Sequence, residues 1–217
     1  AASHRRAIAL NPDYADALNN LGGVLMAQKR PDEAVTHYRK AVSLRPELFQ
    51  LHTNLGVALK ETGRLEDAIA SHRKAIELNP DFAEAHTNLG NALKEAGRLE
   101  DAAASHEKAI RLKPDLAEAH NNLGIALQYL GKLDEAVASY HKALAIKPDY
   151  TKAGRNLLYV MLNVPGLSPE ELYTEHLRFS ESHERGITPM AEPFPNDPTP
   201  DRRLRVGYLS SDFENHP

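Results

Sequence analysis

One polar residue type recurs at a fixed position along this chain and could carry binding chemistry. Asparagines stand 34 residues apart at Asn20, Asn54, Asn88, Asn122 and Asn156. Because an amide side chain both donates and accepts hydrogen bonds, a row of amides could hold the backbone of an extended peptide and tolerate many sequences. The alternative is hydrogen bonding between repeats. A net hydrogen bond contributes only about 0.5–1.5 kcal/mol, so capture of a peptide would be weak.

Histidines also recur at shared positions and raise the question of a metal site. One set is His52, His86 and His120, and another is His4, His72 and His106. Equivalent positions lie one repeat apart, and packed helix axes are about 8–10 Å from one another, whereas a zinc–nitrogen bond is about 2 Å. Other repeats carry Leu18, Tyr38 or Tyr140 at these positions. We therefore expect structural histidines and no metal site.

Two lysines, Lys60 and Lys94, repeat in the same way and suggest a clamp for the C-terminal carboxylate of a peptide. A clamp of that kind gathers several basic and amide groups around one terminus, whereas the row of asparagines is uniform. The alternation of Lys60-Glu61 and Lys94-Glu95 is also typical of a solvated face. Backbone capture by the asparagines is therefore the preferred hypothesis.

The elements that position these residues follow from a strict period. Prolines recur every 34 residues, at Pro12, Pro46, Pro80, Pro114 and Pro148. Within each copy, apolar residues at three- and four-residue spacings predict two amphipathic helices. Glycines such as Gly63 suit the turn between them, and acidic pairs such as Glu66-Asp67 suit the start of the second helix. Small residues at Gly56, Ala68 and Ala75 would let the paired helices approach closely.

The period divides the chain into segments. We expect the end of a truncated repeat at 1–14, four complete copies over 15–150, and a degenerate fifth repeat with a junction helix over 151–186. Ser168-Pro169-Glu170-Glu171 has capping-box spacing, and Leu172, His176, Leu177 and Phe179 offer that helix an apolar face. A proline-rich linker over 187–201 and one β-strand within 202–217 follow. Because the pattern starts within a repeat, we expect the sequence to be a segment of a longer protein.

The repeats resemble the tetratricopeptide (TPR) repeat, which implies an all-α superhelix, or α-solenoid, with an inner groove lined by the first helices. Composition agrees with a folded chain without a strongly charged surface. The 26 basic and 30 acidic residues leave a net charge of −4, which argues against nucleic acid or an anionic membrane as the main partner. No cysteine occurs, and no apolar run approaches about 18 residues. We expect a cytoplasmic protein, and a homo-oligomer is compatible with the sequence.

The stretch RRLRVGYLSSDFENHP, residues 202–217, resembles the opening of the catalytic region of protein O-GlcNAc transferases, including SPINDLY-like bacterial members. Residues 168–186 resemble a helix of the same bacterial proteins. The resemblance implies a GT-B fold whose first Rossmann-like lobe starts at this strand. It also implies UDP-GlcNAc as donor and Ser or Thr of extended peptides as acceptors. His216 matches a histidine of the family's catalytic cleft, and Glu214 departs from the usual glycine.

This segment has no second lobe to hold a nucleotide, so we expect it to bind peptides and to transfer nothing by itself, with no cofactor of its own. Two alternatives stay open. One is a sister glycosyltransferase of the same architecture, with O-fucosyl or N-glucosyl transfer. The other is a TPR scaffold or adaptor without catalysis.

Overall fold

The computed structural model describes residue 6 and residues 8–184, and every regular element among residues 8–184 is a helix. The helices are α2 (Ala15–Ala27), α3 (Pro31–Leu44), α4 (Phe49–Glu61), α5 (Leu65–Leu78), α6 (Ala83–Glu95), α7 (Leu99–Leu112), α8 (Ala117–Tyr129), α9 (Leu133–Ile146), α10 (Thr151–Met161) and α11 (Pro169–Glu184). The predicted two helices per copy are therefore confirmed for the four complete repeats.

The chain divides into two units, Ala1–Arg185 and Gly186–Pro217. The second unit contains the predicted linker, the predicted strand and His216, all of which lie outside the described residues. The account below concerns the first unit.

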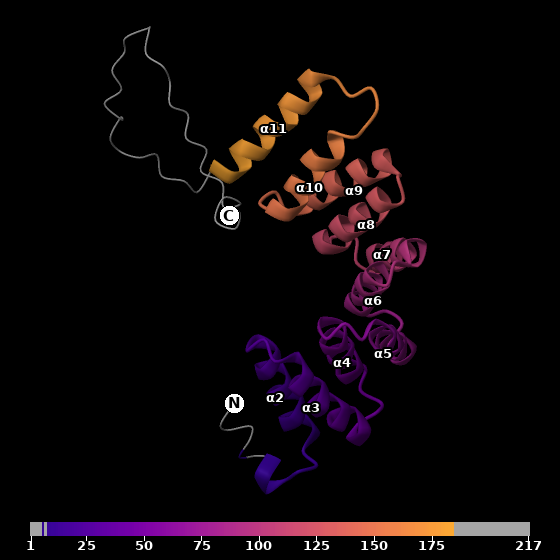
Figure 1. Cartoon of the computed structure of the whole chain (residues 1–217), viewed down its shortest axis with the longest axis vertical. Helices are drawn as coiled ribbons and strands as arrows, with labels where there is room; N and C mark the ends of the chain where they lie inside the picture. The colour runs from indigo at the N-terminus through magenta and orange to yellow at the C-terminus, as the bar shows by residue number, and fades with distance from the viewer. Residues whose placement is uncertain (1–5, 7, 185–217) are drawn as a thin grey trace, which may run out of the picture. The chain divides into compact units, whose positions relative to one another are not determined.

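Successive helices pack as antiparallel pairs that stack on one another (Figure 1). Within the stack, each first helix contacts the first helices of the neighbouring repeats: α2 with α4, α4 with α6, α6 with α8, and α8 with α10. The backbones of the second helices α3, α5, α7 and α9 approach only those of the first helices before and after them. Because the first helices crowd together while the second helices are spread apart, the first helices form the inner face of the stack.

The turns between paired helices depend on a left-handed backbone. Gly63 has φ of +74°, and the equivalent glycines of the next two repeats have nearly the same value. In the first repeat this position is Lys29, with φ of +57°. A side chain in this region costs about 1 kcal/mol, so the first turn keeps the geometry at some cost in stability.

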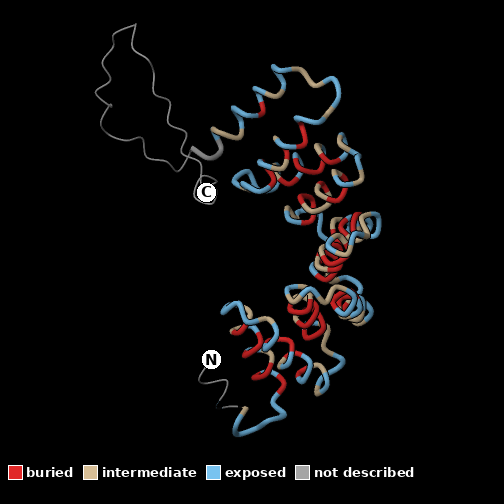
Figure 2. The backbone as a smooth tube through the Cα atoms, viewed as in Figure 1, coloured by how far each residue is buried: buried red, intermediate tan, exposed pale blue. Residues whose placement is uncertain are grey.

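In each helix pair, a ring of the second helix packs against a glycine of the first helix. A Cβ at Gly56 would lie 2.5 Å from the ring of His72, so the ring rests directly on the backbone of α4. The other repeats use the same contact, in the pairs Gly22–Tyr38, Gly90–His106, Gly124–Tyr140 and Gly154–Phe179. Ala68 and Ala75 are fully buried in the same interface, as predicted. Figure 2 shows the buried residues where the helices face one another.

The last glycine contact shows what α11 does. Phe179 of α11 covers Gly154 of α10, so α11 takes the place of a second helix for the fifth repeat. The predicted capping box is confirmed: the amide of Ser168 donates to Glu171 at 2.9 Å, and the amide of Glu171 donates to the Ser168 hydroxyl at 3.1 Å. The predicted docking face is correct at Leu172, which packs against the core.

The prediction is wrong for two residues of that face, because His176 and Leu177 are exposed. Their place is taken by Glu175, which is only 8% exposed. Its carboxylate lies 3.0 Å from Arg178 and 3.9 Å from His141 of α9. A periodicity of apolar residues could not reveal a buried acid that lies between a residue of its own helix and one of α9.

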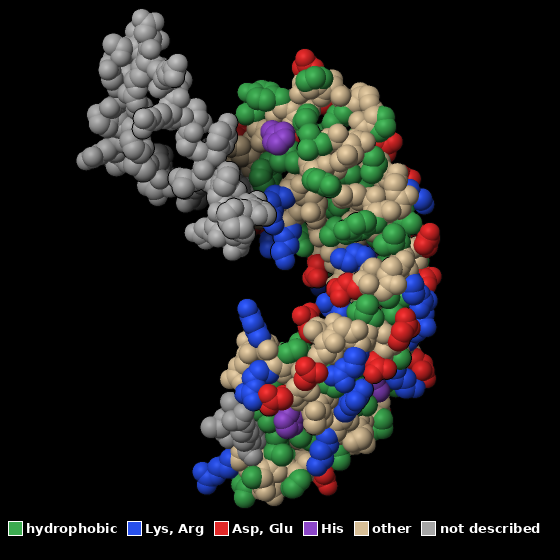
Figure 3. Space-filling model, in the orientation of Figure 1, with side chains coloured by type: hydrophobic (Ala, Val, Ile, Leu, Met, Phe, Trp, Pro, Cys, Tyr) green, Lys and Arg blue, Asp and Glu red, His purple; other side chains and the backbone are tan. Residues whose placement is uncertain are grey.

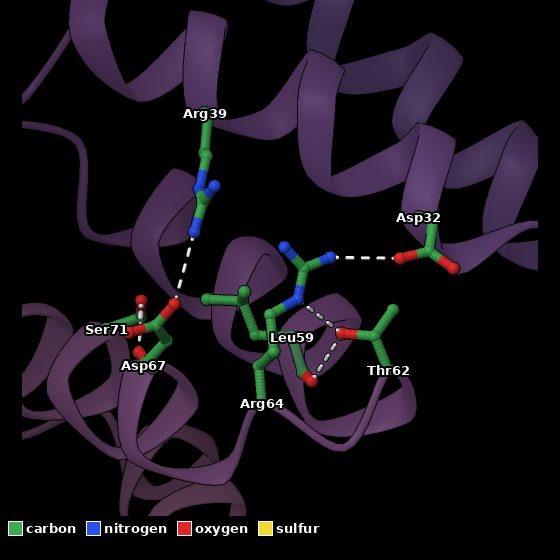
Figure 4. A network of polar contacts seen from close by, with 7 residues as sticks. All are labelled: Asp32, Arg39, Leu59, Thr62, Arg64, Asp67 and Ser71. Atoms are coloured by element: carbon green, nitrogen blue, oxygen red, sulfur yellow. Dashed lines mark hydrogen bonds and ion pairs between the residues drawn. The ribbon is translucent and has the colours of Figure 1, made fainter.

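Ion pairs on the outer side join neighbouring repeats. Arg39 of α3 donates to Asp67 of α5 at 3.1 Å, and Arg64 donates to Asp32 at 3.0 Å (Figure 4). Arg64 also donates to the Thr62 hydroxyl, which in turn donates to the carbonyl of Leu59. Exposed pairs of this type contribute about 0.2–1 kcal/mol each, so they add only modestly to the cohesion of the stack.

Candidate peptide-binding surface

The row of asparagines lies on the inner face, with one member in each first helix from α2 to α10. Each precedes a leucine of the helix core, and a step of one residue turns about 100° around a helix. Asn20 is exposed, and Asn54, Asn88, Asn122 and Asn156 are half-buried. The asparagines therefore lie beside the core and not within it.

Three of these amides hydrogen-bond to the preceding first helix. The donor–acceptor pairs are Asn54 to Asn19 at 2.9 Å, Asn122 to Asn91 at 2.9 Å and Asn156 to Asn121 at 3.0 Å. Inter-repeat bonding, the alternative raised from the sequence, is therefore present for these three. It uses one N–H of each donor, whereas an amide has two N–H groups and a carbonyl oxygen.

The side-chain amides of the other two asparagines, Asn20 and Asn88, form no hydrogen bond with any described residue. The reason for Asn88 lies one repeat earlier. Asn54 and Asn156 both donate to an asparagine that immediately precedes the preceding row member, whereas the corresponding residue for Asn88 is Thr53. The Thr53 hydroxyl donates to the carbonyl of Phe49 at 3.0 Å, within its own helix. Asn88 therefore keeps its full hydrogen-bonding capacity.

The acceptors Asn19, Asn91 and Asn121 were not singled out from the sequence. The doublets Asn19-Asn20 and Asn121-Asn122 are a signal that could have found two of them, because Thr53 and Thr87 stand at the first position in the second and third repeats. Asn121 is 3% exposed and donates to Asn122 at 3.1 Å. Where Asn precedes a row member, as at Asn19 and Asn121, it accepts from the next row member; where Thr precedes it, Asn122 bonds to Asn91 instead and Asn88 has no such partner.

The repeated histidines have two different environments. At the first-helix position, Nε2 lies close to a proline carbonyl oxygen six residues earlier: His52 to Pro46 at 2.9 Å, His86 to Pro80 at 3.0 Å and His120 to Pro114 at 3.0 Å. These rings tie the end of one repeat to the start of the next. The contact assigns the Nε2 proton to each of them.

At the second-helix position, His72 and His106 are fully buried, and neither ring nitrogen has a hydrogen-bond partner. Burial, with a smaller contribution from the charge of Lys60, lowers the pKa of His72 to about 4. Burial likewise lowers the pKa of His106 to about 4, with the same effect from Lys94. Both imidazoles are therefore neutral at pH 7. The described residues contain no group of three or more acidic or histidine side chains placed to hold a metal.

The fold and this inner face define the class: an α-solenoid of two-helix, 34-residue repeats with a polar row on the inside. The tetratricopeptide repeat family model matches residues 15–48 and 117–150, and a TPR repeat model matches residues 58–97 and 90–131. The chain therefore belongs to the tetratricopeptide-repeat family.

Solved structures share the fold. The crystal structure of MamA superimposes with a TM-score of 0.68 at 26% identity, covering 75% of this chain and 94% of that one. PilF of Pseudomonas aeruginosa gives 0.68 at 21% identity, over 79% and 76% of the chains. YrrB, described as a TPR protein with an unusual peptide-binding site, gives 0.63 at 18% identity, over 84% and 93%. No curated protein sequence matches.

These findings show a chain of tetratricopeptide repeats, and nothing in them indicates glycosyl transfer. They do not test His216 or the peptide-binding role of the asparagines. Among the described residues, no helix is both long enough and apolar enough to cross a bilayer.

Proposed function

We propose that residues 15–161 are a peptide-binding scaffold whose inner-face asparagines hold the backbone of an extended peptide. The observation that carries this proposal is the row itself: one amide per first helix, on the inner face, with hydrogen-bonding capacity left over. Asn20 and Asn88 make no bond within the described chain, and Asn54 and Asn156 keep a carbonyl oxygen without a partner. An extended peptide offers both N–H and C=O groups along its length, which an amide can pair with.

The two unbonded asparagines make the test clean, because replacing them removes no bond from the described fold. We expect the full chain to bind a mixed library of Ser- and Thr-containing peptides weakly, and Asn20→Ala with Asn88→Ala to weaken binding about fivefold or more. That loss corresponds to two net hydrogen bonds of about 0.5–1.5 kcal/mol each. Fluorescence anisotropy measures the affinity, and thermal unfolding verifies that the melting temperature is unchanged.

A matched control separates binding from structure. Asn19→Ala removes the acceptor of Asn54 and so disturbs inter-repeat bonding without touching the row. It should lower the melting temperature and leave more of the affinity intact than the Asn20/Asn88 variant. If the double variant binds peptides as the parent does, the row is structural and backbone capture is wrong.

A second candidate is transfer of GlcNAc from UDP-GlcNAc to Ser or Thr, which rests on the resemblance of residues 202–217 and 168–186 to protein O-GlcNAc transferases. In that case the scaffold would present acceptors to a catalytic region that includes His216. Incubating the protein, in the full length that its gene encodes, with radiolabelled UDP-GlcNAc and an acceptor peptide tests this. UDP-glucose and GDP-fucose distinguish the sister transferases, and absence of label from all three leaves the scaffold alone.

A further inference from the structure

Two lysines at the same repeat position differ in whether the chain neutralises them. Lys60, near the end of α4, lies 3.0 Å from Glu61 of its own helix and 3.1 Å from Glu95 of α6. Its side chain is only 20% exposed. The charge of Lys60 is therefore satisfied by one carboxylate from its own repeat and one from the next.

Lys94 occupies the same position in α6, but its surroundings are different. Its neighbour Glu95 is already engaged by Lys60. The residue that would correspond to Glu95 in the following repeat, 34 positions on, is Tyr129. The ammonium group of Lys94 forms neither an ion pair nor a hydrogen bond with any described residue. The alternation of cation and anion along the inner face therefore stops at Lys94.

The side chains at this break line a surface hollow. Lys94, Glu95, Leu99 and Tyr129 surround a space of about 280 Å³. Tyr129 is 68% exposed, so both its ring and its hydroxyl are available to a ligand. A lysine ammonium and a phenolic O–H are both hydrogen-bond donors, and a carboxylate is the acceptor that suits them both. Figure 3 shows acidic and basic side chains intermixed over the middle repeats. The net charge at any one point of this surface therefore depends on which neighbouring side chains form ion pairs.

We propose that Lys94 and Tyr129 form a subsite for a glutamate or aspartate side chain of the bound peptide. This inference rests on the proposed peptide-binding function. The carboxylate would take the place next to Lys94 that Glu95 takes next to Lys60, and it would continue the alternation of charge along the inner face. It also separates the two lysines that the sequence suggested as a joint clamp for a peptide C terminus, because Lys60 is satisfied within the chain.

The test compares two Ser/Thr peptides, amidated at the C terminus and otherwise uncharged, that differ by Glu or Gln at one position scanned along the peptide. We expect the full chain to bind the best Glu peptide about threefold to tenfold more tightly than its Gln partner at low salt. Exposed charge pairs are weak and screened, so this ratio should fall towards one at high salt. Isothermal titration calorimetry measures both affinities.

Three variants locate the preference. Lys94→Gln removes the cation, and Tyr129→Glu supplies the internal partner that Lys60 already has. Both should bring the Glu-to-Gln ratio to about one without weakening the Gln peptide. Lys74→Gln removes the same charge from α5, where Lys74 pairs with Glu77 at 2.8 Å, and it should keep the preference. Circular dichroism verifies that each variant is helical.

The outcomes distinguish the two proposals. If the parent binds both peptides equally, the subsite is wrong and backbone capture stands. A preference that survives Lys94→Gln also overturns the subsite, as does one that requires a free C-terminal carboxylate. If neither peptide binds, both proposals fail.

Discussion

The central and outer repeats share one backbone and differ in the ring that closes each helix pair. In the two outer complete repeats, Tyr38 and Tyr140 lie on a glycine of the first helix. In the two central repeats, His72 and His106 lie on the equivalent glycines. Tyr140 donates its hydroxyl to Gln128 at 3.0 Å, whereas neither histidine has a partner for either nitrogen. The fold thus tolerates a polar ring there only while it is uncharged.

This difference shows that steric fit determines where a ring packs on the first helix. The polarity of the ring determines the pH range over which the helix pair is stable. The glycine leaves room for a flat ring against the backbone, and both rings meet that need. An imidazole, unlike a phenol, can gain a proton between pH 4 and 7. The central repeats should therefore be the acid-sensitive part of the stack.

The largest predicted effect follows from that proton. The folded pKa of each histidine is about 4, below the ordinary 6.5, so the unfolded chain binds protons first as the pH falls. The stability that these rings contribute is fully present above pH 6.5 and is lost as the pH falls from 6.5 to 4. The loss amounts to about 3 kcal/mol per histidine. Urea unfolding at a series of pH values measures it.

The matched control replaces the two histidines with tyrosine, the residue found at the same position in the outer repeats. His72→Tyr with His106→Tyr converts the central repeats to the ring that the outer repeats carry. Because carboxylates titrate equally in both proteins, the difference between their pH profiles isolates the two histidines. The variant should keep more of its stability at pH 4.5, and identical profiles would show that the buried rings do not control acid unfolding.

The second prediction tests the steric half of the comparison with two adjacent glycines of α2. A Cβ at Gly22 would lie 2.6 Å from a ring carbon of Tyr38, so Gly22→Ala should destabilise the fold by about 1–3 kcal/mol through overpacking. At Gly23 the nearest atom would be the Tyr38 hydroxyl oxygen at 3.7 Å, an ordinary contact. Gly23→Ala should instead stabilise by about 0.5–1 kcal/mol, since alanine is the better helix former.

Chemical denaturation of both variants decides the point. Opposite signs at neighbouring positions would show that the ring contact, and not helix propensity, dominates this interface. A gain in stability for Gly22→Ala would contradict the close packing of Tyr38 on α2.

Much of this fold could be predicted because a period repeats the same local signals. The 34-residue spacing located the helix pairs, and Gly56, Ala68 and Ala75 were recognised as the small residues between them. The second helix of the fifth repeat was harder to predict. Phe179 follows Gly154 by 25 residues, whereas Tyr38 follows Gly22 by 16. The longer connection between α10 and α11 moves α11 out of the 34-residue register, so the sequence predicts a junction helix at this position.

The candidate site shows the same limit. The positions of the asparagines follow from helix geometry, but the partner of each amide depends on which side chain the neighbouring helix presents. Asn54 reaches Asn19, while Asn88 faces a position where Thr53 bonds to its own helix. Such pairing joins residues some 35 positions apart, and only the packed structure brings them together.

The smallest predicted effect tests the polar half of the comparison within the outer repeats. Tyr140→Phe removes the hydroxyl that donates to Gln128 at 3.0 Å, and should cost about 1 kcal/mol because it deletes a hydrogen bond and leaves the ring in place. Tyr38→Phe is the control, since the Tyr38 hydroxyl has no hydrogen-bond partner among the described residues, and its change should be near zero. Urea unfolding at pH 7 measures both. Equal losses for the two variants would mean that the bond to Gln128 adds nothing, and that the tyrosine repeats, like the histidine repeats, are held by the fit of the ring alone.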